Sequence, residues 1–378
     1  MNSRERVLAA LSHQPVDQIP IDLCGHNDSC LHEIAYKQLR EYLHLPPETP
    51  VTANPLECVV YAQEEVLRLF NVDTRAVYFP VLDSVGKLQP DGSYLLRWAD
   101  GSIWRKPPGG YYFDLYIPPL RGDLTPKTIA EMAWPTVADT DLARIRARAA
   151  YLRNNTKFAV VISGFLIMPA SGTQLWRGFE QWSIDTLSQT KLWLEMTEAY
   201  MERAFAQADL ILKAVGDNID VAYFIGDDLA TQNGLWVRPS FYRKYIKPFH
   251  QSAMDFIRAR TKAKIIFHIC GSAWELIPDL IEIGVDAINP VQTSAAKMNP
   301  VELKREFGKD IAFWGGVNTQ SVLPFGTRQE VEEEVKQLIN TLGPSGLVLT
   351  SCHNIQPGVP PENIVAMFQA ASKYGRIR

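Results

Sequence analysis

Side chains that could bind a metal ion occur as a closely spaced pair in this sequence. His268 and Cys270 end the apolar run 264–267, which has the composition of a buried strand. Residues two apart on a strand point to the same face, so the imidazole and the thiol should lie side by side. Imidazole and thiolate are ligands that zinc and similar cations prefer. The pair therefore predicts half of a metal site. The alternative is that both are ordinary core residues.

A second pair of these residue types lies near the C-terminus. Cys352 and His353 follow the apolar run Gly346–Ser351, another predicted strand. Adjacent residues on a strand face opposite ways, so only one of the two is expected to join His268 and Cys270. A complete set of three protein ligands is thus available from two strand ends.

Strand and helix patterns alternate along most of the chain. This alternation predicts a parallel α/β fold, and eight strands predict a (β/α)8 TIM barrel formed by one domain, residues 1–378. The predicted strands are Ile19–Leu23, Arg75–Phe79, Phe158–Ser163, Val221–Gly226, Ile265–Ile269, Ala287–Val291, Ile311–Gly316 and Gly346–Ser351. The clearest predicted helices are Ser188–Val215, Pro239–Arg260, Ala273–Ile283, Pro300–Phe307 and Arg328–Leu342.

The segment 81–120 departs from this alternation. Asp-Gly dipeptides at 91–92 and 100–101 separate short β-rich runs, which is typical of β-hairpins. A rigid, aromatic loop with Tyr111 and Tyr112 follows. We expect a β-hairpin insertion beside the barrel mouth, with these two tyrosines at the substrate pocket. The structural alternative is that barrels of this size bury many aromatic side chains.

Polar residues gather after the predicted strands, where the active sites of such barrels lie. We interpret Asp227 and Asp228 as catalytic candidates that orient a ligand histidine or bind a substrate hydroxyl. The alternative is that Asp228 only caps the next segment. The candidates for substrate binding at these ends, beside the two tyrosines, are His26, Asn289, Gln292, Asn318 and Gln356.

The composition is that of an ordinary globular protein, with 46% hydrophobic and 21% charged residues and a formal net charge of −4. The sequence contains no Lys/Arg-rich run, so a nucleic-acid partner is not expected. No apolar stretch approaches the roughly 20 residues of a membrane span, and the N-terminus lacks a signal-peptide core. Five scattered cysteines argue against a disulfide framework. We therefore expect a cytoplasmic protein.

Both ends of the chain resemble the uroporphyrinogen decarboxylase superfamily. The resemblance rests on Ser3–Leu11, Asp17–Pro20, the His-x-Cys-Gly motif at 268–271 and Pro360–Ile364. It covers essentially the whole chain and implies a (β/α)8 barrel with a deep pocket at its mouth. The superfamily contains decarboxylases and corrinoid-linked methyltransferases.

The segment after the first predicted strand separates these two branches. The decarboxylases carry arginines there that bind the propionates of the porphyrinogen, whereas Leu23–Cys30 contains none. A multiply carboxylated tetrapyrrole requires several fixed cations, so decarboxylation is disfavoured. The methyltransferases have a zinc site of the form His-x-Cys with a further cysteine near the C-terminus. Register from the Pro-Pro-Glu-Asn motif places that third ligand at His353, with Cys352 as the alternative.

The tetrapeptide His-Asn-Ile-Gln at 353–356 resembles a subgroup that includes O-demethylases of methoxylated aromatics. This gives the leading hypothesis, a zinc-assisted transfer of methyl from an aryl methyl ether to the cobalt of a corrinoid (cobalamin) carried by a partner protein. The alternatives are a methylcobalamin:thiol or tetrahydrofolate methyltransferase, a uroporphyrinogen-type decarboxylase, or a non-catalytic corrinoid-binding scaffold. A homodimer is expected by analogy alone.

Overall fold

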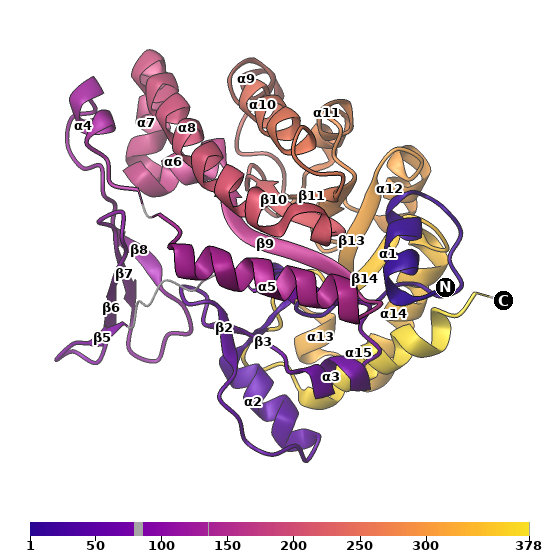
Figure 1. Cartoon of the computed structure of the whole chain (residues 1–378). Helices are drawn as coiled ribbons and strands as arrows, with labels where there is room; N and C mark the ends of the chain where they lie inside the picture. Colours follow the sequence, from indigo (N-terminus) through magenta and orange to yellow (C-terminus); the bar gives the residue numbers. More distant parts are fainter. Residues whose placement is uncertain (79–85, 135, 378) are drawn as a thin grey trace.

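A curled sheet of seven parallel strands forms the centre of the protein (Figure 1). The computed structural model describes residues 1–78, 86–134 and 136–377. Along the sheet the strand order is β14, β13, β12, β11, β10, β9 and β4, so strands that follow one another in the chain are neighbours. The strands are β4 (Thr74–Val77), β9 (Ala159–Ile167), β10 (Val221–Gly226), β11 (Lys264–His268), β12 (Ala287–Asn289), β13 (Ala312–Val317) and β14 (Leu347–Ser351).

The first predicted strand, Ile19–Leu23, is the one that the structure does not form as a strand. Ile21 makes an isolated parallel bridge with Leu349 of β14, and its carbonyl accepts a hydrogen bond from the Asp73 amide at 2.8 Å. The Asp73 side chain in turn accepts from the Ile21 amide at 2.9 Å, and Pro20 has no amide hydrogen to donate. Pro20 and Asp22 make the backbone hydrogen bonds to Leu349, so the segment connects the two edges of the sheet through three residues. The predicted TIM-barrel fold is confirmed, with seven strands and one bridging segment.

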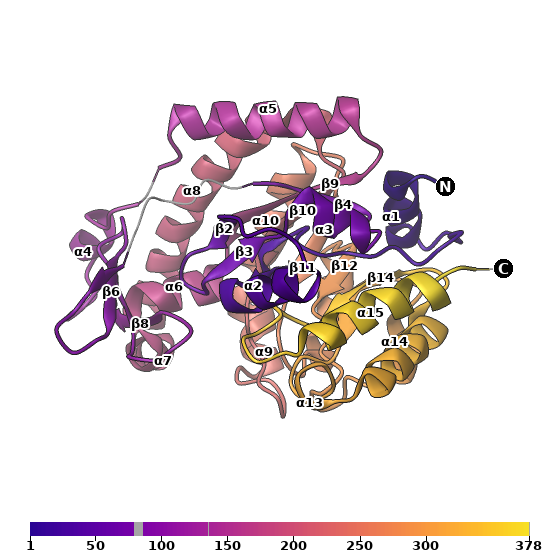
Figure 2. The same ribbon diagram turned by 90° about the horizontal axis from the view of Figure 1, so that it is seen from below.

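Helices connect the strands and flank the curled sheet (Figures 1 and 2). Predicted helices Pro300–Phe307 (α12) and Arg328–Leu342 (α14) have the predicted bounds, and α8 (Thr190–Val215) begins two residues late. The other α-helices are α1 (Ser3–Leu11), α2 (Glu33–Tyr42), α3 (Glu64–Leu69), α4 (Pro126–Ala130), α5 (Asp139–Asn155), α6 (Pro169–Arg177), α7 (Phe179–Ser188), α9 (Pro239–Phe241), α10 (Lys247–Arg258), α11 (Ile277–Glu282), α13 (Val322–Phe325) and α15 (Pro361–Tyr374).

Two predicted helices are divided in the structure. The predicted helix Pro239–Arg260 is α9 and α10 separated by a π-helical turn, Tyr242–Ile246. Pro248 lacks the amide hydrogen that a continuous α-helix would need at that position, which explains the wider turn. The predicted helix Ala273–Ile283 begins as a 3₁₀ turn, Trp274–Leu276, before α11.

The predicted insertion forms a four-stranded antiparallel sheet that stands at one side of the barrel (Figure 1). Its hairpin turns use the predicted Asp-Gly dipeptides: Asp91 accepts from the Ser93 amide at 2.9 Å, and Asp100 accepts from the Ser102 amide at 2.8 Å. The first part of the predicted segment, 81–85, lies outside the described residues. The strands are β5 (Lys87–Leu88), β6 (Tyr94–Arg97), β7 (Ile103–Lys106) and β8 (Asp114–Ile117).

A second small sheet was not predicted. It consists of β1 (Leu31–His32), β2 (Val51–Asn54) and β3 (Val59–Tyr61), and all its pairs are antiparallel. The connection between β2 and β3 carries residues 54–57 to the cavity described below.

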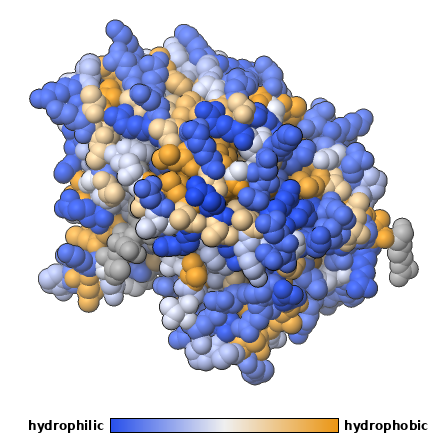
Figure 3. Space-filling model, in the orientation of Figure 1, coloured by the Kyte–Doolittle hydropathy of each residue, from blue (hydrophilic) through white to orange (hydrophobic). Residues whose placement is uncertain are grey.

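The surface in the orientation of Figure 1 is mixed. Hydrophobic residues lie there in several separate groups between hydrophilic ones (Figure 3), which is ordinary for a surface in contact with water. Among the described helices, none combines the length and the apolar composition that crossing a membrane requires.

Candidate metal centre and its cavity

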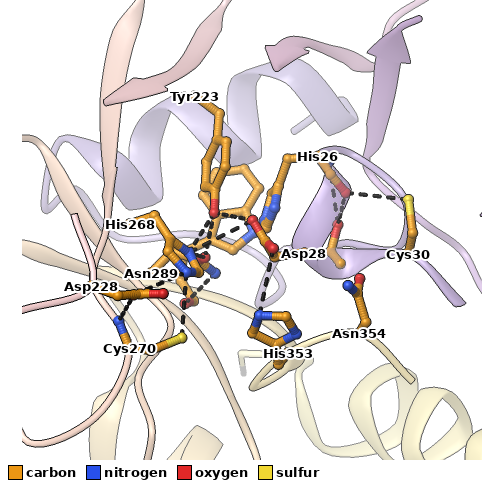
Figure 4. A network of polar contacts seen from close by, with 12 residues as sticks. His26, Asp28, Cys30, Tyr223, Asp228, His268, Cys270, Asn289, His353 and Asn354 are labelled. Carbon is orange, nitrogen blue, oxygen red and sulfur yellow. Dashed lines mark hydrogen bonds and ion pairs between the residues drawn. The ribbon is translucent and has the colours of Figure 1, made fainter. Parts of the chain in front are cut away.

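Three potential metal ligands meet at the C-terminal ends of β11 and β14. One donor atom from each of His268, Cys270 and His353 lies within 4.8 Å of the other two. The Nε2 atom of His268 is 3.3 Å from the Cys270 sulfur (Figure 4). Two nitrogens and one sulfur at such separations suit a zinc ion, which accepts mixed nitrogen and sulfur ligands and keeps a further position open in catalytic sites. The chemistry of these residues therefore fits the metal that the sequence predicts.

A glycine on the neighbouring strand makes room for His268. Gly226 pairs with His268 across β10 and β11, and a Cβ atom at position 226 would lie 2.7 Å from the His268 Cβ. Real Cβ atoms do not approach so closely, so the pairing requires glycine. After His268 the chain turns at Gly271, which has a φ of +85° and places Cys270 back toward the histidine.

Hydrogen bonds fix the orientation of the His268 ring. Its Nδ1 atom is 3.0 Å from the Asn289 Oδ1 and 2.5 Å from the Tyr223 hydroxyl. The Asn289 amide nitrogen donates to the Trp314 carbonyl at 3.2 Å, so its oxygen faces the histidine. Since Nδ1 is occupied in this way, Nε2 is left to face Cys270 and a metal ion. Asn289, predicted as a substrate contact, is buried behind the ligand.

Asp28 contacts both histidines. Its carboxylate oxygens lie 3.6 Å from the His268 Nδ1 and 3.5 Å from the His353 Nε2. It also accepts a short hydrogen bond from the Tyr223 hydroxyl (Figure 4). Sequence reasoning missed both residues. Asp28 lies in the segment that was compared only for its lack of arginine, and Tyr223 lies inside an apolar run that reads as core.

These charges shift the pKa values of the cluster. Burial lowers the pKa of His353, but its hydrogen bond to Cys270 and the charge of Asp28 outweigh burial and raise the pKa to about 9. Burial also lowers the pKa of His268. The negative charges of Cys270 and Asp28 outweigh burial and raise this pKa well above its ordinary value. Burial raises the pKa of Cys270, yet the two imidazoles overcome this and lower it. The cluster therefore favours a thiolate, the form of cysteine that binds metals.

Cys352 lies apart from the cluster. It is buried, its amide donates to the Val317 carbonyl at 2.7 Å, and burial raises the pKa of its thiol far above the usual range. Of the two neighbouring candidates, the structure thus brings His353 to the other two ligands.

The two predicted catalytic aspartates point in different directions. Asp228 is half-exposed at the cluster, where one oxygen accepts from the Cys270 amide at 2.8 Å and lies 3.6 Å from the His268 Nε2. Asp227 is buried and accepts from the Ser171 amide at 2.6 Å, at the N-terminus of α6. It also lies 2.8 Å from the His250 Nε2. Its contacts hold α6 and α10 against β10, which is a structural role.

Two of the predicted substrate contacts, His26 and Gln292, are engaged with other parts of the protein. His26 is fully buried, and its ring stacks on Tyr223 with centroids 4.3 Å apart. Gln292 accepts from the Gly271 amide at 2.7 Å and so holds the turn that follows Cys270. Neither side chain lines the cavity.

The other two predicted polar contacts stabilise loops. Asn318 accepts from the amides of Gln320 and Ser321 at 2.8 and 2.9 Å. The Gln356 side chain donates to the Asn354 carbonyl at 3.0 Å. Both lie on segments that leave the strand ends, as predicted, but outside the cavity lining.

A cavity of about 320 Å³ opens in front of the cluster. The insertion contributes Trp104 and Phe113 to its wall instead of the predicted Tyr111 and Tyr112. Tyr111 is 48% exposed. The lining residues are Asn27, Asp28, Asn54, Leu56, Glu57, Trp104, Phe113, Met168, Leu175, Tyr223, Ile225, Gly226, Asp228, His268 and His353.

Residues 117–374 match the family model described as uroporphyrinogen decarboxylase (URO-D). The chain belongs to the URO-D family. The matched range contains the three candidate ligands, whereas Asp28 and most of the insertion precede it. The resemblance inferred from the two ends of the sequence is thereby confirmed.

Relatives with different activities share this family. The chain is 27% identical over 161 residues to uroporphyrinogen decarboxylase 2, chloroplastic, of Oryza sativa subsp. japonica, covering 42% of this chain and 38% of that protein. It is 25% identical over 151 residues to the methylated-thiol–coenzyme M methyltransferase of Methanosarcina mazei, covering 40% and 37%. The chain thus spans about two fifths of the length of these relatives.

A solved structure covers the chain more completely. A methyltransferase from Methanosarcina mazei superposes with a TM-score of 0.66 over 99% of both chains, at 16% sequence identity. This likeness shows that the whole chain shares the fold of that structure.

Proposed function

We propose that this URO-D family member is a methyltransferase that moves a methyl group from a methoxylated aromatic to the cobalt of a corrinoid carried by a partner protein. The observation that carries the proposal is the meeting of His268, Cys270 and His353, two of which line a cavity with aromatic residues. A methyl ether is hard to cleave because its oxygen must leave with a negative charge. A site that stabilises this charge supplies what the reaction needs.

His268, Cys270 and His353 would hold a zinc ion. When bound, the metal would act as a Lewis acid toward the donor's oxygen and stabilise its developing charge. The protein's own part is to hold the ligands in place: Asn289 and Tyr223 orient His268, Asp28 contacts both histidines, and Asp228 binds the Cys270 amide. Such contacts around the ligands set their orientation and basicity.

The proposed transfer breaks one bond and forms another. The bond between methyl carbon and oxygen breaks, and its electron pair stays on oxygen, which takes up a proton and leaves as the phenol. The new bond between methyl carbon and cobalt uses the electron pair of Co(I), which becomes methylated Co(III). The reduced corrinoid comes from the partner protein and must reach the methyl group from the open side of the barrel mouth.

The aromatic walls suit a flat donor. Trp104 and Phe113 from the insertion and Tyr223 from β10 line the cavity. Aromatic pairs gain about 0.5–1.5 kcal/mol beyond area burial when they stack or meet edge to face. These side chains would hold an aryl ring while its methoxy group faces the ligands.

A second candidate function is methyl transfer that involves a thiol. The name of the Methanosarcina mazei relative assigns it a methylated thiol, and a metal site with an open position would also hold a thiolate. Porphyrinogen decarboxylation is less favoured, because no described lining residue is a lysine or arginine that could bind propionates.

One experiment separates these functions. The protein is purified, its metal content is measured, and methylation of cob(I)alamin is followed spectrally with methoxyarenes, a methylated amine and a methylated thiol. We expect about one zinc per chain and methylcobalamin from a methoxyarene. Methylcobalamin from the thiol alone would favour the second candidate. The absence of both metal and methyl transfer would favour a non-catalytic corrinoid-binding scaffold.

A further inference from the structure

The charge of the cavity wall restricts the methyl donors that can enter. Three lining residues, Asp28, Glu57 and Asp228, are carboxylates. Among the described lining residues none is lysine or arginine, and the undescribed segment 79–85 contains neither residue type in its sequence. In the metal-containing protein, where both lining histidines would be neutral metal ligands, an anionic donor would therefore meet three carboxylates and no lysine or arginine to pair with.

A cationic residue on the insertion does not change this picture. Lys106 is not a lining residue. Its Nζ lies 5.3 Å from the centroid of the Phe113 ring, 5.2 Å from that of Tyr94 and 3.7 Å from the Cys58 sulfur.

The wall also offers hydrogen-bond acceptors. One oxygen of Glu57 accepts a hydrogen bond from the Asn354 side-chain amide at 2.8 Å. One oxygen of Asp228 accepts from the Cys270 backbone amide. A carboxylate has further acceptor sites on its two oxygens. Asn27 is another lining residue, and its buried Oδ1 atom has no hydrogen-bond partner in the structure. These acceptors suit a ligand that donates hydrogen bonds.

Metal binding would reduce the negative charge without reversing it. A divalent cation would add two positive charges beside the Cys270 thiolate and the three carboxylates. The three carboxylates of the lining and the metal-bound Cys270 thiolate outnumber the two charges of the ion.

We propose that the methyl donor is a methoxyarene with a ring substituent that bears a hydroxyl or ammonium group, such as hydroxymethyl or ammoniomethyl, and that the cavity selects against carboxylated methoxyarenes. This inference rests on the proposed function and names its substrate class. An anion would lose its hydration and meet like charges across a few ångströms, and both effects weaken binding. A hydroxyl or ammonium group would donate to the free acceptors of the wall.

The test uses three donors with one skeleton: 3-methoxybenzyl alcohol, 3-methoxybenzylamine and 3-methoxybenzoate. Binding to the metal-containing protein is measured by calorimetry at neutral pH, and methyl transfer to cob(I)alamin is measured separately. We expect the benzoate to bind at least about tenfold more weakly than the alcohol, and the amine at least as tightly as the alcohol. Calorimetry measures binding without methyl transfer. A failure of the inferred charge preference can therefore be distinguished from a failure of the proposed function.

A charge variant with a matched control sharpens the test. Met168 lines the cavity at the start of α6 and is partly exposed, so Met168→Lys places a cation in the wall, and Met168→Gln is the uncharged control. We expect Met168→Lys to raise the affinity for the benzoate relative to the alcohol by about tenfold, and Met168→Gln to leave the ratio near that of the native protein. Benzoate binding within twofold of the alcohol in the native protein would overturn the inference, whether or not methyl transfer is found.

Discussion

Replacing Tyr223 with phenylalanine tests whether the residues around the cluster hold the ligands for a metal. The Tyr223 hydroxyl donates to Asp28 and lies 2.5 Å from the His268 Nδ1 and 3.1 Å from the Asn289 Oδ1. The variant removes only this oxygen. The phenyl ring can keep the stacking on His26, whose centroid is 4.3 Å away.

The size of the effect follows from these contacts. Loss of a partner that orients a ligand costs about 10- to 100-fold in metal affinity, or roughly 1.4–2.7 kcal/mol. The buried Asp28 carboxylate would also lose its hydroxyl donor, so the metal-free protein should lose roughly 1–3 kcal/mol of stability. We therefore expect Tyr223→Phe to bind zinc about 10- to 100-fold more weakly than the native protein.

The assay is competition for zinc against a chromophoric chelator, with urea unfolding measured on the metal-free forms. Tyr242→Phe is the matched control, because Tyr242 is a fully buried tyrosine whose hydroxyl likewise lies near a histidine nitrogen, 3.2 Å from that of His250. It should lose stability and keep its zinc affinity. Equal zinc affinity in Tyr223→Phe and the native protein would refute a role of Tyr223 in orienting His268.

Three further predictions follow from the structure. Cys270→Ala should lose bound zinc, whereas Cys352→Ala should retain it, as measured by metal analysis; the reverse result would show that the neighbouring thiol is the ligand. Burial raises the pKa of Glu334 to about 7 from an ordinary value of 4.5, so the folded state resists ionisation of this group. Stability should therefore fall by at most about 3 kcal/mol as the pH rises from 4.5 to 7, and urea unfolding of Glu334→Gln should show a smaller fall; an unchanged pH dependence would exclude this cause. Trp104→Ala should raise the dissociation constant of a bound methoxyarene about two- to tenfold in calorimetry, and Tyr111→Ala, outside the cavity lining, should not; equal effects would mean that the insertion binds the donor differently.

The barrel could be predicted because its strands are buried on both faces and so read as continuous apolar runs. Val221–Gly226 was predicted with its bounds, and β11 and β14 within one residue at either end. The exception is Ile19–Leu23, which has the same composition. There the Ile21 amide donates its hydrogen bond to the Asp73 side chain instead of to the carbonyl of a neighbouring strand. No local sequence pattern predicts such a bond to a distant carboxylate.

The candidate ligands could be predicted because strand periodicity places His268 and Cys270 on one face and separates Cys352 from His353. The aromatic wall was harder to predict. Which side chains of the insertion face the cavity depends on the register of its hairpins and on how its sheet meets the barrel. The wall contains Trp104 of β7 and Phe113, which immediately follows the two predicted tyrosines.

The position of Asp28 shows how one segment could separate the two branches of the family. The bridge of Ile21 to Leu349 closes the barrel and directs the following residues to its mouth. There Asp28 meets Tyr223 and the histidines of β11 and of the segment after β14. In the decarboxylases, the resemblance implies, the corresponding segment carries arginines that bind propionates. A carboxylate in that place would offer no anion site and would add a partner for the two candidate ligand histidines. The same exchange would therefore disfavour a polyanionic substrate and support a metal centre.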